Sequence, residues 1–256
     1  MPFYSLIRRK SSFGMQRLTF FLEKMFQKRG SVSQMLRERY LEFGGVESEM
    51  LPDIQSLDDQ LIAIKLDAQA LVSGLTEEQG GWRAAANSWS VAECFDHLAI
   101  TNRVYLSAMN DAAHRARLGG KLRRDPAVPG IVGRWFVNRM EPSTKPRSGM
   151  KAPRIICPRN APQLSDAIGN FHVSHFEVRF FLSSFAQIDL AGVYFANPFI
   201  PGVRFSLATG LHVILAHERR HLCQAWRTRR GAVEAVRARV EIARLFNTGT
   251  SRRMLA

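Results

Sequence analysis

Apolar side chains recur at intervals of three and four residues along several stretches of the chain, and this spacing is typical of amphipathic helices. It predicts a first helix over about residues 57–75, a third over 163–187 and a fourth over 206–227. A further, basic helix is expected over residues 232–246, because Gly231 interrupts the chain just before it. Each long helix carries one apolar face, so each is expected to pack against its neighbours.

The second helix has the clearest start signal in the sequence. Ser90 and Glu93 form a capping box, in which the serine side chain accepts from the Glu93 backbone N–H and the glutamate side chain reaches back. Trp89 and Cys94 flank this start and are expected to form a hydrophobic staple. The helix is expected to end at about residue 118, where two glycines follow.

Residues 119–162 contain seven of the eleven prolines and many bases, which predicts a long irregular connection between the second and third helices. A short helix is expected within it around Trp135, Phe136 and Val137. A connection of this length inside a compact domain is usually functional. Four long helices with one long crossover predict an all-α fold, a four-helix bundle with additional terminal helices.

The chain carries 36 Lys and Arg residues against 22 Asp and Glu residues, a formal net charge of +14. The bases gather in three segments: residues 1–40 hold nine bases and two acids, 115–159 twelve and two, and 219–256 ten and two. Residues 51–114, by contrast, hold three bases and nine acids. Since a nucleic-acid domain usually gathers its bases on one helix or stripe, most of them are interpreted as solvated surface. A nucleic-acid-associated protein that uses its basic helices remains an alternative.

The patterns divide the chain into a basic N-terminal extension over residues 1–50, the bundle over 51–230, and a basic C-terminal helix and tail over 231–256. The extension is expected to be loosely packed or disordered, and a targeting segment or a start-site artefact stays open. The three cysteines lie far apart, which favours reduced thiols and a cytoplasmic location. No uncharged apolar run reaches about 18 residues, so no transmembrane segment is predicted.

Three histidines are candidates for binding a metal ion. His217 and His221 are four residues apart on the fourth helix, so they share one face of it. His97 follows the apolar pattern of the second helix and can point into the bundle from the opposite side. Three imidazoles converging in this way can hold a divalent metal and leave one coordination position open. The alternative is that these histidines are ordinary core or surface residues.

The sequence from His217 to His221 also reads H-E-x-x-H, the zinc-protease motif in which Glu218 would be the general base. Two arginines, Arg219 and Arg220, stand between the histidines on a helix that a protease would bury under its cleft. A zinc protease is therefore the less favoured interpretation.

Further residues are expected near the same site. His175, on the apolar stripe of the third helix, could line a pocket, and Gln224 could line its rim. Arg154, from the long connection, could pair with a carboxylate-bearing substrate. Asp96 and Glu218 neighbour the histidines and are interpreted as partners that orient imidazoles or as ordinary surface acids.

Two stretches resemble a known family, the DinB-like (DinB/YfiT) superfamily, whose members are regarded as metalloenzymes. The resemblance covers about residues 55–230. The first stretch comprises residues 58–75, Gly81-Trp82-Arg83, Asn87-Ser88-Trp89-Ser90-Val91-Ala92-Glu93 and Asp96-His97-Leu98-Ala99. The second runs from Leu211 to Gln224 and includes both histidines of the fourth helix.

The resemblance implies a DinB-like four-helix bundle in which His97, His217 and His221 hold a divalent metal ion, typically zinc or nickel. Relatives include thiol S-transferases that use bacillithiol and mycothiol-dependent isomerases. The implied function is a metal-dependent transferase of the thiol S-transferase type, or a hydrolase, acting on a small molecule. A low-molecular-weight thiol cosubstrate and a homodimer are further expectations. The alternative is a non-catalytic binding protein with a structural metal.

Overall fold

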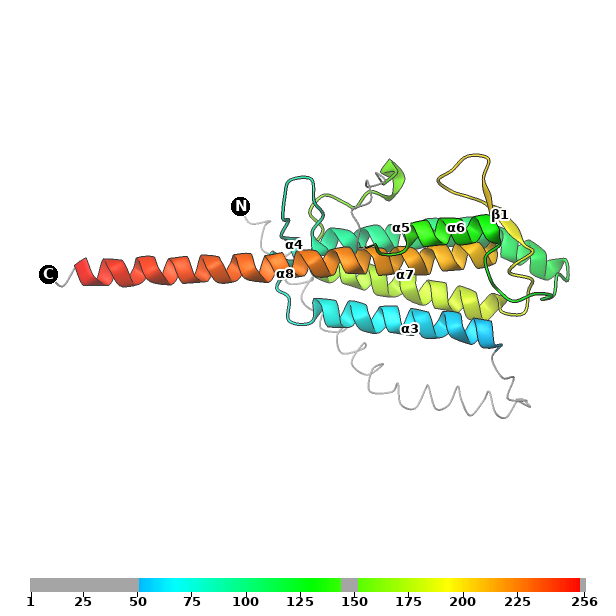
Figure 1. Cartoon of the computed structure of the whole chain (residues 1–256), viewed down its shortest axis with the longest axis horizontal. Coiled ribbons are helices and arrows are strands. Elements are labelled where there is room, and N and C mark those ends of the chain that lie inside the picture. Colours follow the sequence, from blue (N-terminus) through cyan, green and yellow to red (C-terminus); the bar gives the residue numbers. More distant parts are fainter. Residues whose placement is uncertain (1–50, 144–151, 254–256) are drawn as a thin grey trace, which may run out of the picture. The chain divides into compact units, whose positions relative to one another are not determined.

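The computed structural model of the protein describes residues 51–143 and 152–253 (Figure 1). These belong to one compact unit, Leu51–Ala256. The expectations for residues 1–50 lie outside the described residues. The helices are α3 (Pro52–Val72), α4 (Glu77–Gly81), α5 (Val91–Leu118), α6 (Ile131–Met140), the 3-10 turn η1 (Arg154–Ile156), α7 (Leu164–Phe185) and α8 (Leu207–Arg253), and the strands are β1 (Tyr194–Ala196) and β2 (Arg204–Ser206).

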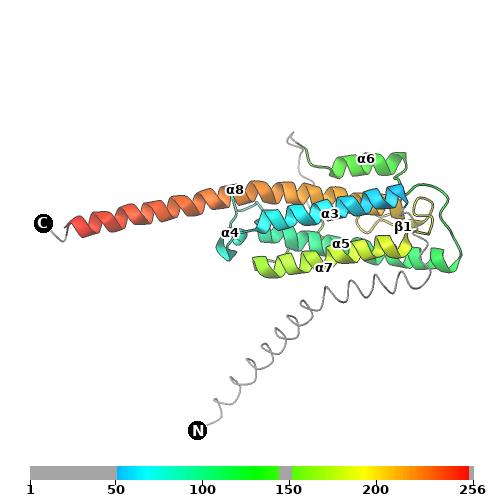
Figure 2. The ribbon, with the colours of Figure 1, turned by 90° about the horizontal axis from the view of Figure 1, so that it is seen from below.

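Helices α3, α5, α7 and the first half of α8 run side by side (Figure 1 and Figure 2). The main contacts of α3 are with α7 and α8, and α5 contacts the same two helices, so α3 and α5 occupy opposite corners of the bundle. This arrangement confirms the predicted all-α fold. An antiparallel hairpin, β1 with β2, was not expected, and it pairs Phe195 with Phe205 just before α8 begins.

Helix α3 begins at Pro52, about five residues before the predicted start. Proline fits the first helical position because its fixed φ is already helical and the missing N–H would have no partner there. The helix ends at Val72, close to Gly74, whose φ of +73° suits the turn that follows. Its buried face consists of Ile54, Leu57, Leu61, Ile64, Ala68 and Leu71.

A short helix that the apolar pattern did not predict, α4, follows α3. It begins with a capping box between Thr76 and Gln79, which can be read from the sequence by the same rule that applies to α5. The carboxylate of Glu77 accepts hydrogen bonds from the backbone N–H groups of Leu164 and Ser165. This contact ties α4 to the first turn of α7.

Helix α5 confirms the predicted start and end. The Ser90 side chain accepts from the Glu93 N–H at 3.1 Å, and the Glu93 carboxylate accepts from the Ser90 N–H at 2.9 Å. Glu93 also binds Arg83, whose Nε donates at 2.8 Å. The helix ends at Leu118, and Gly119 is its C-cap.

The long connection between α5 and α7 contains more helix than the three residues expected. Helix α6 spans ten residues and packs against α8, and η1 packs against α5. The connection therefore lies over the two helices that carry the candidate histidines. Helix α7 starts at Leu164 and ends at Phe185, close to the predicted bounds.

Helix α8 corrects one prediction, because the chain forms one helix of 47 residues where a fourth helix and a separate basic helix were expected. Gly231 does not interrupt it. A Cβ atom at Gly231 would lie 2.9 Å from the ring of Trp82, so the glycine allows this ring to approach the helix closely. Among the residues described, no helix is long and apolar enough to cross a membrane.

Candidate metal centre

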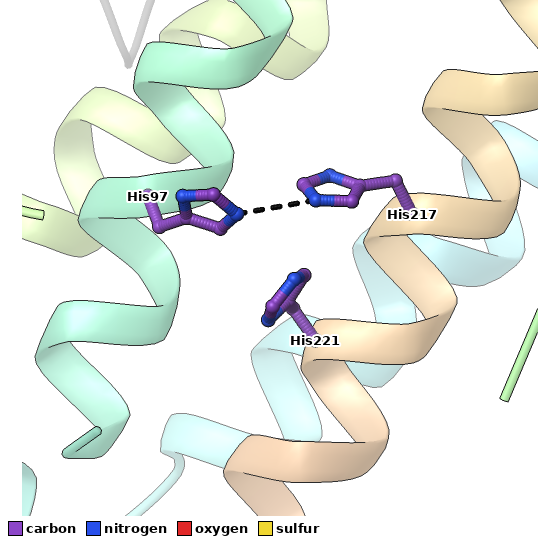
Figure 3. A group of neighbouring side chains, drawn as sticks. All are labelled: His97, His217 and His221. Atoms are coloured by element: carbon purple, nitrogen blue, oxygen red, sulfur yellow. Dashed lines mark hydrogen bonds between the residues drawn. The ribbon is translucent and has the colours of Figure 1, made fainter. Parts of the chain in front are cut away.

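His97 from α5 and His217 and His221 from α8 point toward one another (Figure 3). One potential ligand atom from each lies within 4.8 Å of the others. The Nε2 atoms of His97 and His217 are 3.1 Å apart. The three ring centroids are separated by 4.5–4.9 Å. The structure thus brings together the three histidines that the sequence singled out.

The ring of His97 is fixed by a backbone carbonyl. Its Nδ1 lies 2.5 Å from the carbonyl oxygen of Ile156, the last residue of η1. A carbonyl oxygen only accepts hydrogen bonds, so Nδ1 carries the proton and donates it. The Nε2 atom therefore presents its lone pair to the other two histidines, which is the tautomer that a metal ligand requires.

His217 and His221 each have a buried Nδ1 atom with no hydrogen-bond partner among the described residues. Burial, His221, His97 and Arg220 hold the pKa of His217 well below its usual value. Burial, His97 and Arg220 lower the pKa of His221 to about 3. Both imidazoles are therefore neutral at neutral pH and keep lone pairs for a ligand.

Trp89 forms one wall of the group. Its ring centroid lies 4.7 Å from that of His97 and 5.5 Å from that of His221, and it stacks on His221. Trp89 immediately precedes the Ser90 cap of α5, and its carbonyl accepts from the Thr228 hydroxyl at 3.3 Å. Burial is the largest cause of the lowered pKa of His97.

The three residues fit a divalent metal ion. Neutral imidazoles are typical ligands of zinc and of other divalent transition metals, and three protein ligands leave a further position open. His97 and His217 already present their Nε2 atoms to each other at 3.1 Å, so both can face one ion. This group of histidines could therefore hold a divalent metal ion.

Asp96 is not a surface acid. Asp96 is only 2% exposed. Its carboxylate accepts three hydrogen bonds from Arg159, one from the backbone N–H and two from the guanidinium group. Asp96 does not orient another imidazole in any contact seen among the described residues. It holds the chain segment that follows Ile156.

Glu218 and His175 form a buried pair at a neighbouring face of α8. Both carboxylate oxygens of Glu218 lie 3.2 Å from Nδ1 of His175, and Asn102 donates to Glu218 at 2.7 Å. The Nε2 of His175 donates to the carbonyl of Leu61 at 3.0 Å. These contacts join α3, α5, α7 and α8. In the described part of the chain, neither Glu218 nor His175 has a side-chain contact with the three histidines.

This placement argues against a zinc protease. Glu218 is fully buried, and its carboxylate is occupied by His175 and Asn102. A general base must reach a water molecule at the metal, and this side chain points to a different face of the helix, toward His175 and Asn102.

Gln224 and Arg154 are the other two residues that the sequence predicted near the group. Gln224 lies close enough to His221 to raise the pKa of that histidine, against the larger effect of burial. Arg154 is exposed on η1, two residues from the carbonyl that binds His97. Arg220, which the sequence did not single out as part of the site, is close enough for its charge to lower the pKa of His217 and His221.

Sequence reasoning missed Ile156 and Arg159 altogether. Ile156 acts through its backbone carbonyl, which any residue would provide, so no side-chain signal exists for it. For Arg159 the only hint was the acid next to His97, since a buried acid requires a cationic or N–H partner.

Comparisons with known proteins bear on the family. The DinB superfamily model matches residues 60–225, a span that contains all three histidines. Searches of curated proteins and of solved structures each found no significant match. The match covers more than half of the chain, and the bundle and the order of its motifs agree with it. The chain therefore belongs to the DinB superfamily.

Proposed function

We propose that His97, His217 and His221 bind one zinc or nickel ion and that the protein is a metal-dependent transferase or hydrolase of a small molecule. The observation that supports this most is the set of neutral imidazoles on two helices, with one ligand atom from each within 4.8 Å of the others. A cation bound there would supply a Lewis acid that lowers the pKa of a thiol or water molecule.

The chain's own residues have separable roles in this proposal. Ile156 keeps the His97 lone pair directed at the group, and Trp89 excludes water from one side of it. Arg154 and Arg220 favour an anionic group on the substrate or on a thiol cosubstrate.

The favoured reaction is transfer to a low-molecular-weight thiol. The thiol sulfur would bond to an electrophilic carbon, the leaving group would depart with its electron pair, and the thiol proton would pass to solvent. In hydrolysis, water would take the place of the thiol.

Full-length protein loaded with zinc or with nickel, screened with pairs of thiols and electrophiles, tests the proposal. Turnover that requires both metal and thiol is expected. Turnover without any thiol would exclude the transferase version and favour hydrolysis. Stoichiometric metal without turnover over a broad screen would favour the non-catalytic alternative, in which the metal is structural.

A cytoplasmic location and a homodimer complete the proposal. Free thiols at Cys94, Cys157 and Cys223 are consistent with a reducing compartment. Light scattering of the purified full chain measures the oligomeric state, and a monomeric mass would remove the homodimer.

A further inference from the structure

A short segment of the long connection is attached to α5 at two neighbouring points. We call residues 154–159 the strap. The Ile156 carbonyl of the strap binds His97, and three residues later Arg159 binds Asp96. Because Asp96 and His97 are consecutive in the chain, one turn of α5 fixes both ends of this contact.

Arg159 makes three short hydrogen bonds to the Asp96 carboxylate. The Arg159 backbone N–H donates at 2.7 Å, its Nε at 2.9 Å and its Nη2 at 2.6 Å. The Asp96 side chain is 2% exposed, whereas that of Arg159 is 59% exposed. A buried carboxylate is costly without partners, so Asp96 strongly favours the strap conformation that supplies these three donors.

The Ile156 end determines the chemistry of His97. A neutral imidazole carries its proton on either nitrogen, and only the form with the proton on Nδ1 leaves Nε2 free for His217 and His221 to share a ligand with it. The carbonyl selects that form. Groups that orient a ligating histidine in this way typically contribute about 10–100-fold to metal affinity.

We infer that Asp96 is a positioning residue: through Arg159 it holds the strap so that the Ile156 carbonyl fixes the tautomer and ring orientation of His97. The inference rests on the proposed function for its effect on metal affinity, but its effect on the tautomer exists without metal. Asp96 touches neither the other two histidines nor any reacting group in the described structure, so it acts through the strap.

The bundle offers a matched control. Arg179 and Asp58 form a similar paired contact, with Nε donating at 2.7 Å and Nη2 at 2.8 Å, between α7 and α3. Removal of the Arg159 or the Arg179 side chain deletes one bidentate ion pair with an aspartate. Of these two pairs, the one formed by Arg159 and Asp96 is next to a candidate metal ligand, His97.

The test compares full-length wild type with Arg159→Ala and Arg179→Ala. Nitrogen-15 spectra of the histidine rings in metal-free protein report which nitrogen of His97 carries the proton. A zinc titration with a competing chelator then reports affinity. Arg159 is more than half exposed, so truncating its side chain leaves no cavity in the core.

We expect wild type and Arg179→Ala to show the Nδ1–H form of His97 and to bind zinc equally within about twofold. We expect Arg159→Ala to show a mixture of tautomers and about 10–100-fold weaker binding, with part of the loss recovered in Arg159→Lys. Asp96→Asn is expected to behave like Arg159→Ala.

Unchanged His97 spectra in Arg159→Ala would overturn the inference, even if affinity fell. Equal weakening in Arg179→Ala would also overturn it, because the effect would then be general stability. Failure of wild type to bind zinc or nickel would instead contradict the proposed function, and the metal-free spectra would still decide the role of Asp96.

Discussion

Helix α8 presents histidine chemistry on two sides, and the two clusters differ in whether their polar atoms have partners. The three-histidine group contains two buried Nδ1 atoms without hydrogen bonds among the described residues. In the pair formed by Glu218 and His175, both imidazole nitrogens and both carboxylate oxygens are engaged. Both clusters contain imidazoles largely removed from solvent, and they differ in that the pair satisfies its own polar atoms whereas the three-histidine group does not.

The comparison also explains why a motif can mislead. Glu218 lies directly after His217, but consecutive residues on a helix point about 100° apart. The two histidines at a spacing of four therefore face His97, while the glutamate between them faces His175 and Asn102. The histidines of the H-E-x-x-H string thus belong to the three-histidine group, and its glutamate belongs to a separate contact with His175.

The largest expected effect is loss of metal from the three-histidine group. His217→Ala with His221→Ala should reduce bound zinc or nickel from about one ion per chain to almost none, because a single remaining imidazole cannot hold the ion. Elemental analysis of purified protein measures this, and circular dichroism checks that the helices remain. Unchanged metal content in the double variant would place the metal elsewhere.

The next largest effect is expected at the buried pair. Glu218→Ala leaves His175 and Asn102 without their shared acceptor and should lower the free energy of unfolding by about 3–5 kcal/mol. Urea unfolding followed by circular dichroism measures it. A midpoint equal to that of wild type would show that the pair contributes little to the bundle.

A double substitution sharpens the same point. Glu218→Leu with His175→Leu replaces both partners by apolar side chains, and most of the lost stability should return. A double variant that is less stable than Glu218→Ala would show that the two side chains stabilise the bundle by more than supplying hydrogen-bond partners to each other.

Zinc should stabilise the folded protein through the three-histidine group, whether or not the pair of Glu218 and His175 is intact. At about 100 times the dissociation constant, zinc should raise the free energy of unfolding by about 2.7 kcal/mol in wild type. The same increase is expected in the Glu218→Leu, His175→Leu variant and none in His217→Ala, His221→Ala. Equal stabilisation of all three proteins would indicate binding outside the histidine group.

The smallest expected effect concerns Gln224, which lies close enough to His221 to raise its pKa. Gln224→Ala should weaken zinc binding by about fivefold, equivalent to about 1 kcal/mol for one hydrogen bond. Gln60→Ala is the control, since Gln60 bonds Ser56 and Arg219 and none of the three histidines in the described contacts. Equal losses in both variants would remove the specific role of Gln224.

Local signals in the sequence predicted much of the fold. The Ser90 and Glu93 capping box and the apolar periodicity of α5 and α7 depend on residues near one another in the chain, so they can be read directly. The continuity of α8 could not be read in this way. Gly231 accommodates the ring of Trp82, about 150 residues earlier in the chain, so this glycine marks a close approach and not a helix end.

For the candidate site, too, local patterns could be predicted and long-range contacts could not. The spacing of His217 and His221 and the family resemblance predicted the three-histidine group, because a helix fixes which side chains share a face. The Ile156 carbonyl and the buried position of Asp96 depend on how the long connection folds back over α5. Proline and arginine content marked that connection as irregular but could not give its path.

X-ray absorption spectroscopy on the zinc-loaded full-length protein tests the central claim most directly, because it identifies the atoms bound to the metal. The account predicts one zinc ion with three imidazole nitrogens and a further light-atom ligand. Sulfur ligands, fewer than three imidazoles, or the same spectrum from the His217→Ala, His221→Ala variant would contradict it.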